Sequence, residues 1–117
     1  TGTMVTGNLV AELQNLESDF SQPIREWTTE NVWGVVWADE TLPRKTRSLL
    51  NVALTAALRC SHETKVHIRG AINNGCTREE IRAVLMQAAI YCGVPLALAA
   101  FRIASDAIKA YEAERTA

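Results

Sequence analysis

The sequence lacks a pair of cysteines spaced as Cys-x-x-Cys, although it contains three cysteines among its 117 residues. Cys60, Cys76 and Cys92 are odd in number, which argues against a disulfide framework. Their spacing argues against a zinc knuckle or a dithiol redox centre. We expect reduced, partly buried thiols.

The sequence also lacks an excess of charge of one sign and a long apolar run. The chain has 12 Lys and Arg residues and 13 Asp and Glu residues, which gives a net charge of -1. Without a basic block, neither nucleic acid nor an anionic membrane is expected as a partner. No run approaches the ~20 apolar residues that span a bilayer, and no signal-peptide pattern begins the chain, so we expect a cytoplasmic protein. Because the first residue is Thr1, we also expect a trimmed or processed chain.

No segment alternates apolar and polar residues over the length of a strand, so the sequence predicts an all-α fold of five to six helices. We expect an N-terminal arm over 1–18, one helical domain over 19–112 and a frayed tail over 113–117. A domain this small is short of the surface needed to enclose a deep cleft alone, so we expect sites shared between subunits.

Glycine, proline and capping residues divide the expected helical domain into segments. We predict two short helices within 19–37, broken at Gly34, and further helices over 43–59 and 95–110. Ser61 is a candidate cap for the next helix, and Gly75 is a candidate for its end. Thr77 and Glu80 form a capping-box pattern. Helices 43–59 and 95–110 are apolar on more than one face, which predicts oligomerisation.

Glu63 and His67 are the strongest candidates for chemistry. Residues four apart on a helix differ by only ~40° in direction, so the pair is predicted to share one face near a helix start, as a proton-handling pair. Spacing alone more often reflects an exposed ion pair. His62 diverges from His67 by about 140°, and His-Glu-x-x-x-His does not fit the zinc motif, so we expect no metal.

Further candidates are cationic or aromatic. Arg44 and Arg47 lie at the start of the 43–59 helix, where cations oppose the helix dipole, and their guanidinium groups suit carboxylates. A surface salt bridge explains them about equally well. Trp33, Trp37 and Tyr91 are candidate walls of a pocket for a flat ligand, although large aromatic residues more often form core.

Several of these residues stand in a recognisable order and spacing between positions 33 and 104. The segments are Trp33-Gly34 with Trp37, RKTRSLL at 44–50, Glu63 with HIRGA at 67–71, NNG at 73–75, TREEI at 77–81, YCGVP at 91–95 and AFRIA at 100–104. In this pattern the chain resembles the carboxymuconolactone decarboxylase family. The likeness favours a functional role for Glu63, His67 and Arg47.

The resemblance implies an alkyl-hydroperoxidase D-like helical fold, assembled as a homotrimer or homohexamer with sites near subunit contacts. It also implies decarboxylation of 4-carboxymuconolactone, a small anionic lactone, to 4-oxoadipate enol-lactone in protocatechuate (β-ketoadipate) catabolism. In peroxidase relatives a second cysteine stands where this chain has Glu63, so Cys60 lacks a resolving partner and hydroperoxide reduction is less favoured.

In that lactone the electrons left by carbon dioxide delocalise onto a conjugated carbonyl, so no cofactor is expected. We predict that His67 donates a proton to carbon while Glu63 orients it, because an unperturbed glutamate is a scarce acid at neutral pH. The reverse assignment stays open. Other open alternatives are a paralogue with another substrate, a thiol enzyme using Cys60, and a non-catalytic assembly subunit.

Overall fold

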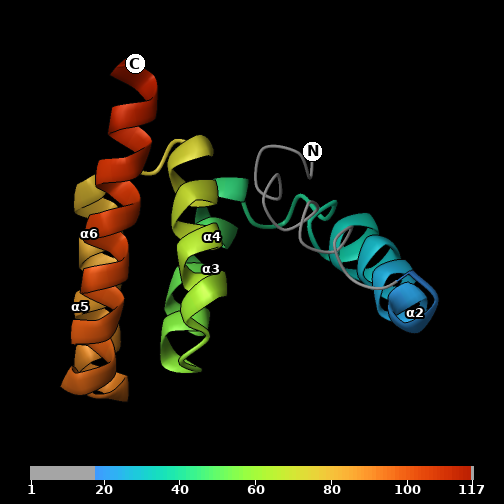
Figure 1. Ribbon diagram of the computed structural model, residues 1–117, viewed down its shortest axis with the longest axis horizontal. Coiled ribbons are helices and arrows are strands. Elements are labelled where there is room, and N and C mark those ends of the chain that lie inside the picture. The colour runs from blue at the N-terminus through green and yellow to red at the C-terminus, as the bar shows by residue number, and fades with distance from the viewer. Residues whose placement is uncertain (1–17, 117) are drawn as a thin grey trace.

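The computed structural model describes residues 18–116 of the chain, and these residues form helices joined by short turns (Figure 1). In chain order the elements are α2 (Ser18–Thr28), η1 (Thr29–Val36), α3 (Arg44–Ala57), α4 (Ser61–Asn73), α5 (Arg78–Cys92) and α6 (Val94–Thr116). No strand occurs between residues 18 and 116, so the prediction of an all-α fold is confirmed. Nearly all of the expected 1–18 arm lies outside the described residues.

Helices α3 to α6 form a four-helix body. The hairpins α3–α4 and α5–α6 pack side by side, so that α3 also contacts α5 and α4 also contacts α6 (Figure 1). Val52, Ile68, Ile81 and Leu85 are at most 1% exposed at the centre. Small residues such as Ala104 and Ala107 complete the core from α6 and allow close approach of the helices.

The start of α5 and the end of α4 follow the expected local chemistry. The Thr77 hydroxyl accepts from Glu80 N at 3.1 Å, and Thr77 N donates to Glu80 Oε1 at 2.9 Å, which confirms the capping box. After α4, Gly75 has φ +91°, and Cys76 N donates to Ala71 O at 2.9 Å. This closure resembles a Schellman motif and requires the left-handed conformation that glycine tolerates.

Ser61 does not cap α4, contrary to our prediction. Cys60 holds the capping position without a side-chain hydrogen bond, and Ser61 is already the first helical residue. The turn from α3 places Arg59 at φ +59°, and Cys60 N donates to Thr55 O at 2.9 Å. This turn fixes where α4 begins. The prediction that the Glu63 and His67 pair lies near a helix start is confirmed, with Glu63 in the first turn of α4.

Helix α6 runs to Thr116, beyond both the expected helix end at 110 and the expected start of a frayed tail at 113. Arg69 Nη2 of α4 donates to Glu114 Oε2 at 2.6 Å, and Tyr111 Oη donates to Asn73 Oδ1 at 3.1 Å. These contacts to α4 stabilise the last turns of α6, in a charged segment for which the sequence predicted a frayed tail.

The first two elements form one continuous arm. Gly34 does not break it, contrary to our prediction, because the helix changes pitch at Thr29 and continues to Val36. Trp37 N donates to Val32 O at 2.8 Å, the five-residue spacing of a π-helix. Near the change of pitch, Thr28 Oγ1 and Thr29 Oγ1 donate to carbonyls four residues earlier, at 2.6 and 3.0 Å. Side chains thus satisfy carbonyls where the backbone ladder changes register.

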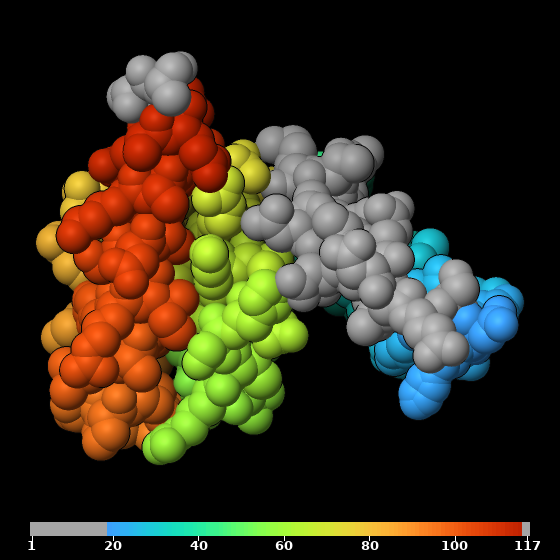
Figure 2. Space-filling model, in the orientation of Figure 1, coloured from blue at the N-terminus to red at the C-terminus, as the bar shows by residue number. Residues whose placement is uncertain are grey.

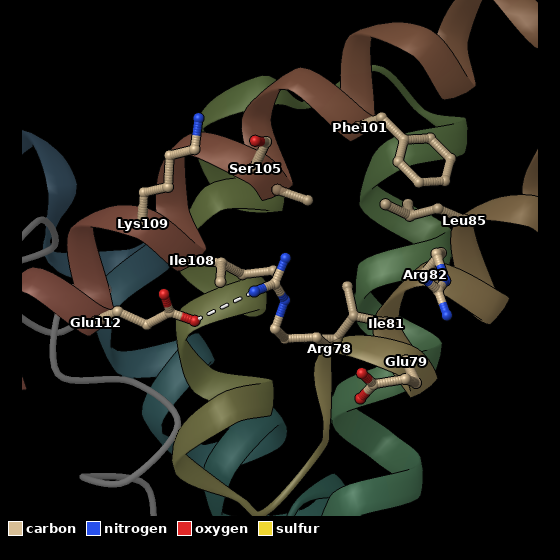
Figure 3. A pocket seen from close by; sticks show the side chains of 11 residues that line it. Arg78, Glu79, Ile81, Arg82, Leu85, Phe101, Ser105, Ile108, Lys109 and Glu112 are labelled. Carbon is tan, nitrogen blue, oxygen red and sulfur yellow. Dashed lines mark ion pairs between the residues drawn. The ribbon is translucent and has the colours of Figure 1, made fainter.

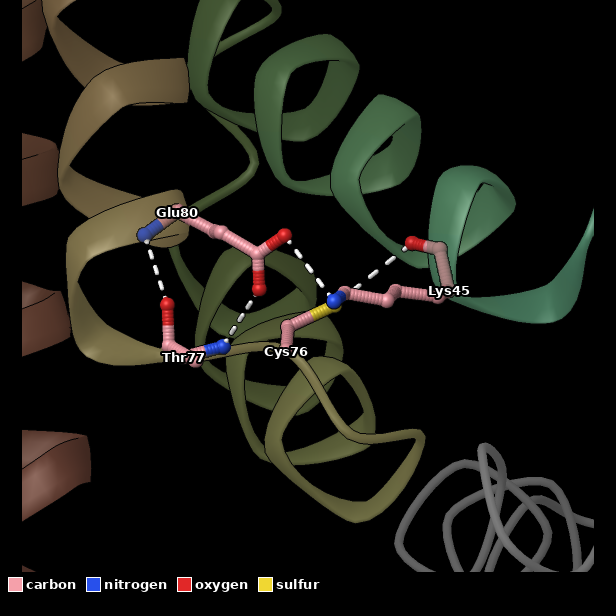
Figure 4. Close-up of polar contacts among 4 residues, drawn as sticks. All are labelled: Lys45, Cys76, Thr77 and Glu80. Carbon is pink, nitrogen blue, oxygen red and sulfur yellow. Dashed lines mark hydrogen bonds and ion pairs between the residues drawn. The ribbon is translucent and has the colours of Figure 1, made fainter.

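A polar cluster joins the starts of α3 and α5 (Figure 4). Lys45 Nζ lies 3.0 Å from Glu80 Oε2, and the buried Cys76 thiol donates to Lys45 O at 3.5 Å. Burial raises the pKa of Cys76, with Glu80 adding to this effect and Lys45 opposing it. The thiol is therefore a neutral packing group, and the cluster anchors the first turn of α3.

The arm projects away from the four-helix body, and its first residues lie at an edge of the molecule (Figures 1 and 2). Phe20 and Trp27 of α2 are 76% and 56% exposed. None of the helices between residues 18 and 116 is long and apolar enough to cross a membrane.

Candidate functional site

Glu63 and His67 are the third and seventh residues of α4, one turn apart. Glu63 is exposed to solvent, whereas His67 is half-buried. Burial lowers the pKa of His67, and the nearby Glu63 carboxylate partly opposes this by favouring the charged ring. The pair therefore combines a sheltered imidazole with a carboxylate in contact with water.

Arg47 lies in the first turn of α3 with its side chain only 14% exposed. Its Nη2 donates to Asp39 O at 3.2 Å and lies 3.9 Å from Asp39 Oδ2. The Asp39 carboxylate itself accepts from Thr41 N and Thr41 Oγ1, and these bonds, more than Arg47, lower the pKa of Asp39. One edge of the guanidinium is thus held by the turn before α3.

Two buried nitrogen atoms in the described part of the chain have no hydrogen-bond partner: Arg47 Nε and His67 Nδ1. An unsatisfied buried polar atom costs about 1–3 kcal/mol, so such atoms are uncommon in a folded protein. They are explained when a ligand or an ordered water completes their hydrogen bonds. Both belong to side chains that the sequence had already singled out.

Arg47 and Trp37 line one hollow of about 200 Å³ between the end of η1 and α3. Its other lining residues are Val32, Val36, Leu50 and Asn51. Trp33 packs against Trp37 with ring centroids 5.8 Å apart and planes inclined at 38°. The structure therefore brings together a sheltered cation and an aromatic wall.

Other predicted site residues lie elsewhere. Arg44 is exposed at the first position of α3. Tyr91 is 78% exposed and lines a separate apolar groove of about 510 Å³ between α3 and α5. The lining of the Arg47 hollow does not include Glu63 or His67. Tyr91 and Arg47 thus line different hollows of the chain, and a site shared between subunits stays a prediction.

Sequence reasoning missed Asp39 and Asn51. Asp39 holds the guanidinium of Arg47, and Asn51 lines the same hollow one helical turn after it. The signal for Asp39 was present, because Asp-x-Thr ahead of Pro43 is typical of a turn in which aspartate accepts from the backbone. Asn51 carried no comparable signal within an apolar helix.

A further hollow of about 460 Å³ lies between α5 and α6 (Figure 3). Leu85 and Phe101 line it, and Arg78 of α5 reaches Glu112 of α6 in an ion pair at 3.6 Å. Glu79 and Arg82 of α5 line it as well. None of the predicted catalytic or binding residues lines this hollow.

Comparison with known proteins identifies the family of this chain. The model of the carboxymuconolactone decarboxylase family matches residues 22–106. The chain belongs to that family. The match spans most of the α2–η1 arm, the Arg47 hollow, the Glu63 and His67 pair and most of the four-helix body.

Two named relatives are decarboxylases, which supports a carboxy-lyase. The chain is 36% identical over 97 residues to a 4-carboxymuconolactone decarboxylase of Acinetobacter baylyi, covering 83% of this chain and 72% of the relative. It is 43% identical over 89 residues to the nitrosuccinic acid decarboxylase npaB of Metarhizium robertsii, covering 76% of this chain and 62% of the relative. The chain thus spans less than two thirds of the second relative's length. The two relatives are named for different substrates.

Proposed function

We propose that this protein is a cofactor-free decarboxylase of a small, multiply carboxylated acid, with 4-carboxymuconolactone as the first candidate substrate. The observation that supports it most directly is the pair of unpartnered, buried nitrogen atoms on Arg47 and His67 in a member of a decarboxylase family. Such atoms suit an anionic ligand. With that substrate, the reaction would belong to protocatechuate catabolism, by way of 4-oxoadipate enol-lactone.

The chemistry of the two relatives' substrates narrows the class of acid. In 4-carboxymuconolactone a conjugated lactone carbonyl accepts the electrons left by carbon dioxide, and in nitrosuccinic acid the nitro group beside the carboxylate does so. Each substrate thus carries its own electron sink, and the protein need only stabilise the developing anion and protonate carbon. We therefore propose that the substrate has an electron-withdrawing group conjugated with, or beside, the departing carboxylate.

His67 is the proposed proton donor. Loss of carbon dioxide leaves a carbanion that takes up one proton, so each turnover consumes one proton from the protein. Because burial lowers the pKa of His67, its ring is mainly neutral at pH 7 until an anionic substrate favours the imidazolium form. Glu63 favours the same form from one helical turn away and, being exposed, can exchange protons with water.

Arg47 is the proposed carboxylate anchor. Asp39 holds one side of the guanidinium, while the buried Nε remains available to a second acceptor. A carboxylate can bridge Nε and a terminal nitrogen in a two-pronged contact. Trp37, which packs at a tilt against Trp33, offers an aromatic surface in the same hollow, and Arg44 supplies a further positive charge at the start of the same helix.

The test is turnover of 4-carboxymuconolactone and, in parallel, of nitrosuccinate, followed by ultraviolet absorbance and by released carbon dioxide. We expect stoichiometric carbon dioxide from one of them. His67→Ala should lower kcat at least ~100-fold and Glu63→Gln by ~10-fold, because a positioned proton donor contributes on that scale. His62→Ala, on a different face of the same helix, should stay within about twofold. Near-native turnover of both His67→Ala and Glu63→Gln would reject the assignment.

Arg47→Lys tests the anchor separately from the proton donor. Lysine keeps the charge but cannot make a two-pronged contact, so KM should rise ~10-fold while kcat changes less. Arg102→Lys, at an exposed position of α6, is the matched control. Equal KM values for the two variants would make Arg47 a structural residue. Peroxide consumption with a dithiol, lost in Cys60→Ser, would instead favour the thiol alternative.

A further inference from the structure

Two apolar surfaces stand exposed among residues 18–116, the part of the chain that the structure describes. The first is a stripe on α2 formed by Phe20, Ile24 and Trp27, which are 76%, 51% and 56% exposed. Positions four and seven residues apart on a helix point within about 60° of each other, so the three side chains lie along one face. Contiguous apolar side chains exposed in this way mark a surface suited to contact with another protein surface.

The second surface is the groove between α3 and α5. It is lined by apolar side chains, among them Leu50, Leu54 and Val84, and by Tyr91. Leu50 and Leu54 are 46% and 56% exposed, so the groove opens to solvent along its length. Along α3 the lining runs from Thr46 to Ala57, about 16 Å at the rise of a helix.

The two surfaces match in form and length. The eleven residues of α2 extend over about 16 Å, within one residue of the length of the α3 side of the groove. An amphipathic helix lying in an apolar groove is a common way for proteins to associate, with anchors at positions i, i+4 and i+7. The residues Phe20, Ile24 and Trp27 have this spacing.

The arm cannot bring α2 onto the groove of its own chain without breaking. Helix α2 continues directly into η1, and the end of η1 is fixed beside α3, where Val36 and Leu50 line one hollow. From there the arm runs outward (Figure 1). We infer that α2 of one copy of this chain docks in the α3/α5 groove of a second copy.

The arrangement has a consequence for assembly and for the Arg47 hollow. The α2 stripe and the α3/α5 groove are different surfaces. Two copies would therefore exchange arms reciprocally in a dimer, or three or more copies would close into a ring, such as a trimer. Leu50 lines both the groove and the Arg47 hollow, so a docked α2 would lie beside the entrance to that hollow. The inference itself rests on these surfaces and does not require the proposed reaction.

Cys92 provides a direct test, because this native thiol is exposed and lines the groove. In the full chain, Ile24→Cys should form a disulfide with Cys92 of another copy under mild oxidation, seen as a covalent dimer on a non-reducing gel and mapped by mass spectrometry. Adding Cys92→Ser should abolish that linkage. Gln22→Cys, on the opposite face of α2, is the matched control and should form at least tenfold less dimer.

Three results of the cross-linking experiment would overturn the inference. A disulfide within one chain would mean that the arm folds back, and equal dimer yields from Ile24→Cys and Gln22→Cys would mean random collision. Absence of any Ile24–Cys92 linkage would leave the groove to another occupant, such as residues 1–17 of this chain.

Light scattering during size-exclusion chromatography provides an independent readout. Ile24→Glu in the stripe and Leu54→Glu in the groove should each weaken association at least ~100-fold, because docking would bury an unpaired carboxylate. Leu98→Glu, at a 52% exposed position of α6, is the matched control and should leave the mass unchanged. Helical circular dichroism verifies folding. A native chain that is monomeric at micromolar concentration would overturn the inference.

Discussion

The four-helix body and the α2–η1 arm are both helical, but different interactions hold them. In the body, Val52, Ile68 and Leu85 are fully buried, and polar pairs join helices distant in sequence. In the arm, Ile24 and Trp27 are about half exposed, and the hydrogen bonds of Thr28 and Thr29 stay within four residues. Helicity therefore does not distinguish the part that supplies stability from the part that is available for binding.

The largest effect should come from the same substitution made in each region. Ile68→Ala removes a fully buried side chain and should lower the free energy of unfolding by about 2–5 kcal/mol. Ile24→Ala in the arm should cost less than about 1 kcal/mol at concentrations where the chains are dissociated. Urea titrations followed by circular dichroism measure both. Equal costs would mean that the arm belongs to the core, and a cost for Ile24→Ala that grows with protein concentration would locate its contact between copies.

A polar pair should give the next largest difference. Asn74 Nδ2 donates to Ser48 Oγ at 2.9 Å, and Ser48 is only 1% exposed. Ser48→Ala leaves that amide without its acceptor and should cost about 1–3 kcal/mol. Thr28→Ala in the arm removes a bond at an exposed site and should stay within ~0.5 kcal/mol. The same titrations apply, and a larger loss for Thr28→Ala would reverse the contrast.

The capping box should give a smaller and more local effect. Thr77→Ala removes the acceptor of Glu80 N and should lower the free energy of unfolding by about 1 kcal/mol. Hydrogen exchange should accelerate in the first turn of α5 and remain unchanged in α2. Faster exchange throughout the body would mean that the box stabilises more than its own helix.

The smallest effect concerns pH, and it also falls on the body, since both histidines lie on α4. Because burial lowers the pKa of folded His67 below 6.5, the unfolded chain binds more protons just below that pH. The contribution of His67 to the free energy of unfolding should therefore be constant above pH 6.5, and it should fall as the pH is lowered from 6.5 through the pKa of His67 in the folded protein. His67→Gln should flatten this dependence, which denaturant midpoints measured from pH 5 to 8 would reveal. An unchanged slope in His67→Gln would contradict it.

Local sequence chemistry predicted local structure well. Thr77 with Glu80 marked the start of α5 correctly and Gly75 marked the end of α4, because caps and positive φ angles depend on a few adjacent residues. The predicted helix break at Gly34 was wrong, because the change to π geometry occurs five residues earlier and Gly34 lies inside the helix. The extension of α6 could not be predicted, because Glu114 is held by Arg69, 45 residues away in sequence.

Some features of the candidate site could likewise be predicted from the sequence, and others could not. The one-turn spacing of Glu63 and His67 was readable from the sequence, because helical periodicity alone fixes it. The turn in which Asp39 anchors Arg47 carried a local signal, but the hollow that Arg47 lines and its separation from Tyr91 carried none, because they depend on how η1, α3 and α5 pack.

Residue order was enough to indicate an all-helical chain of the carboxymuconolactone decarboxylase family, with an acid and a base one turn apart, because periodicity, capping and motif order are properties of neighbouring residues. The packing of the helices was needed to learn which side chains of residues 18–116 are sheltered, which of their buried nitrogen atoms lack a partner and which of their apolar faces are exposed. Burial arises where segments distant in the chain meet, and no local pattern encodes that meeting.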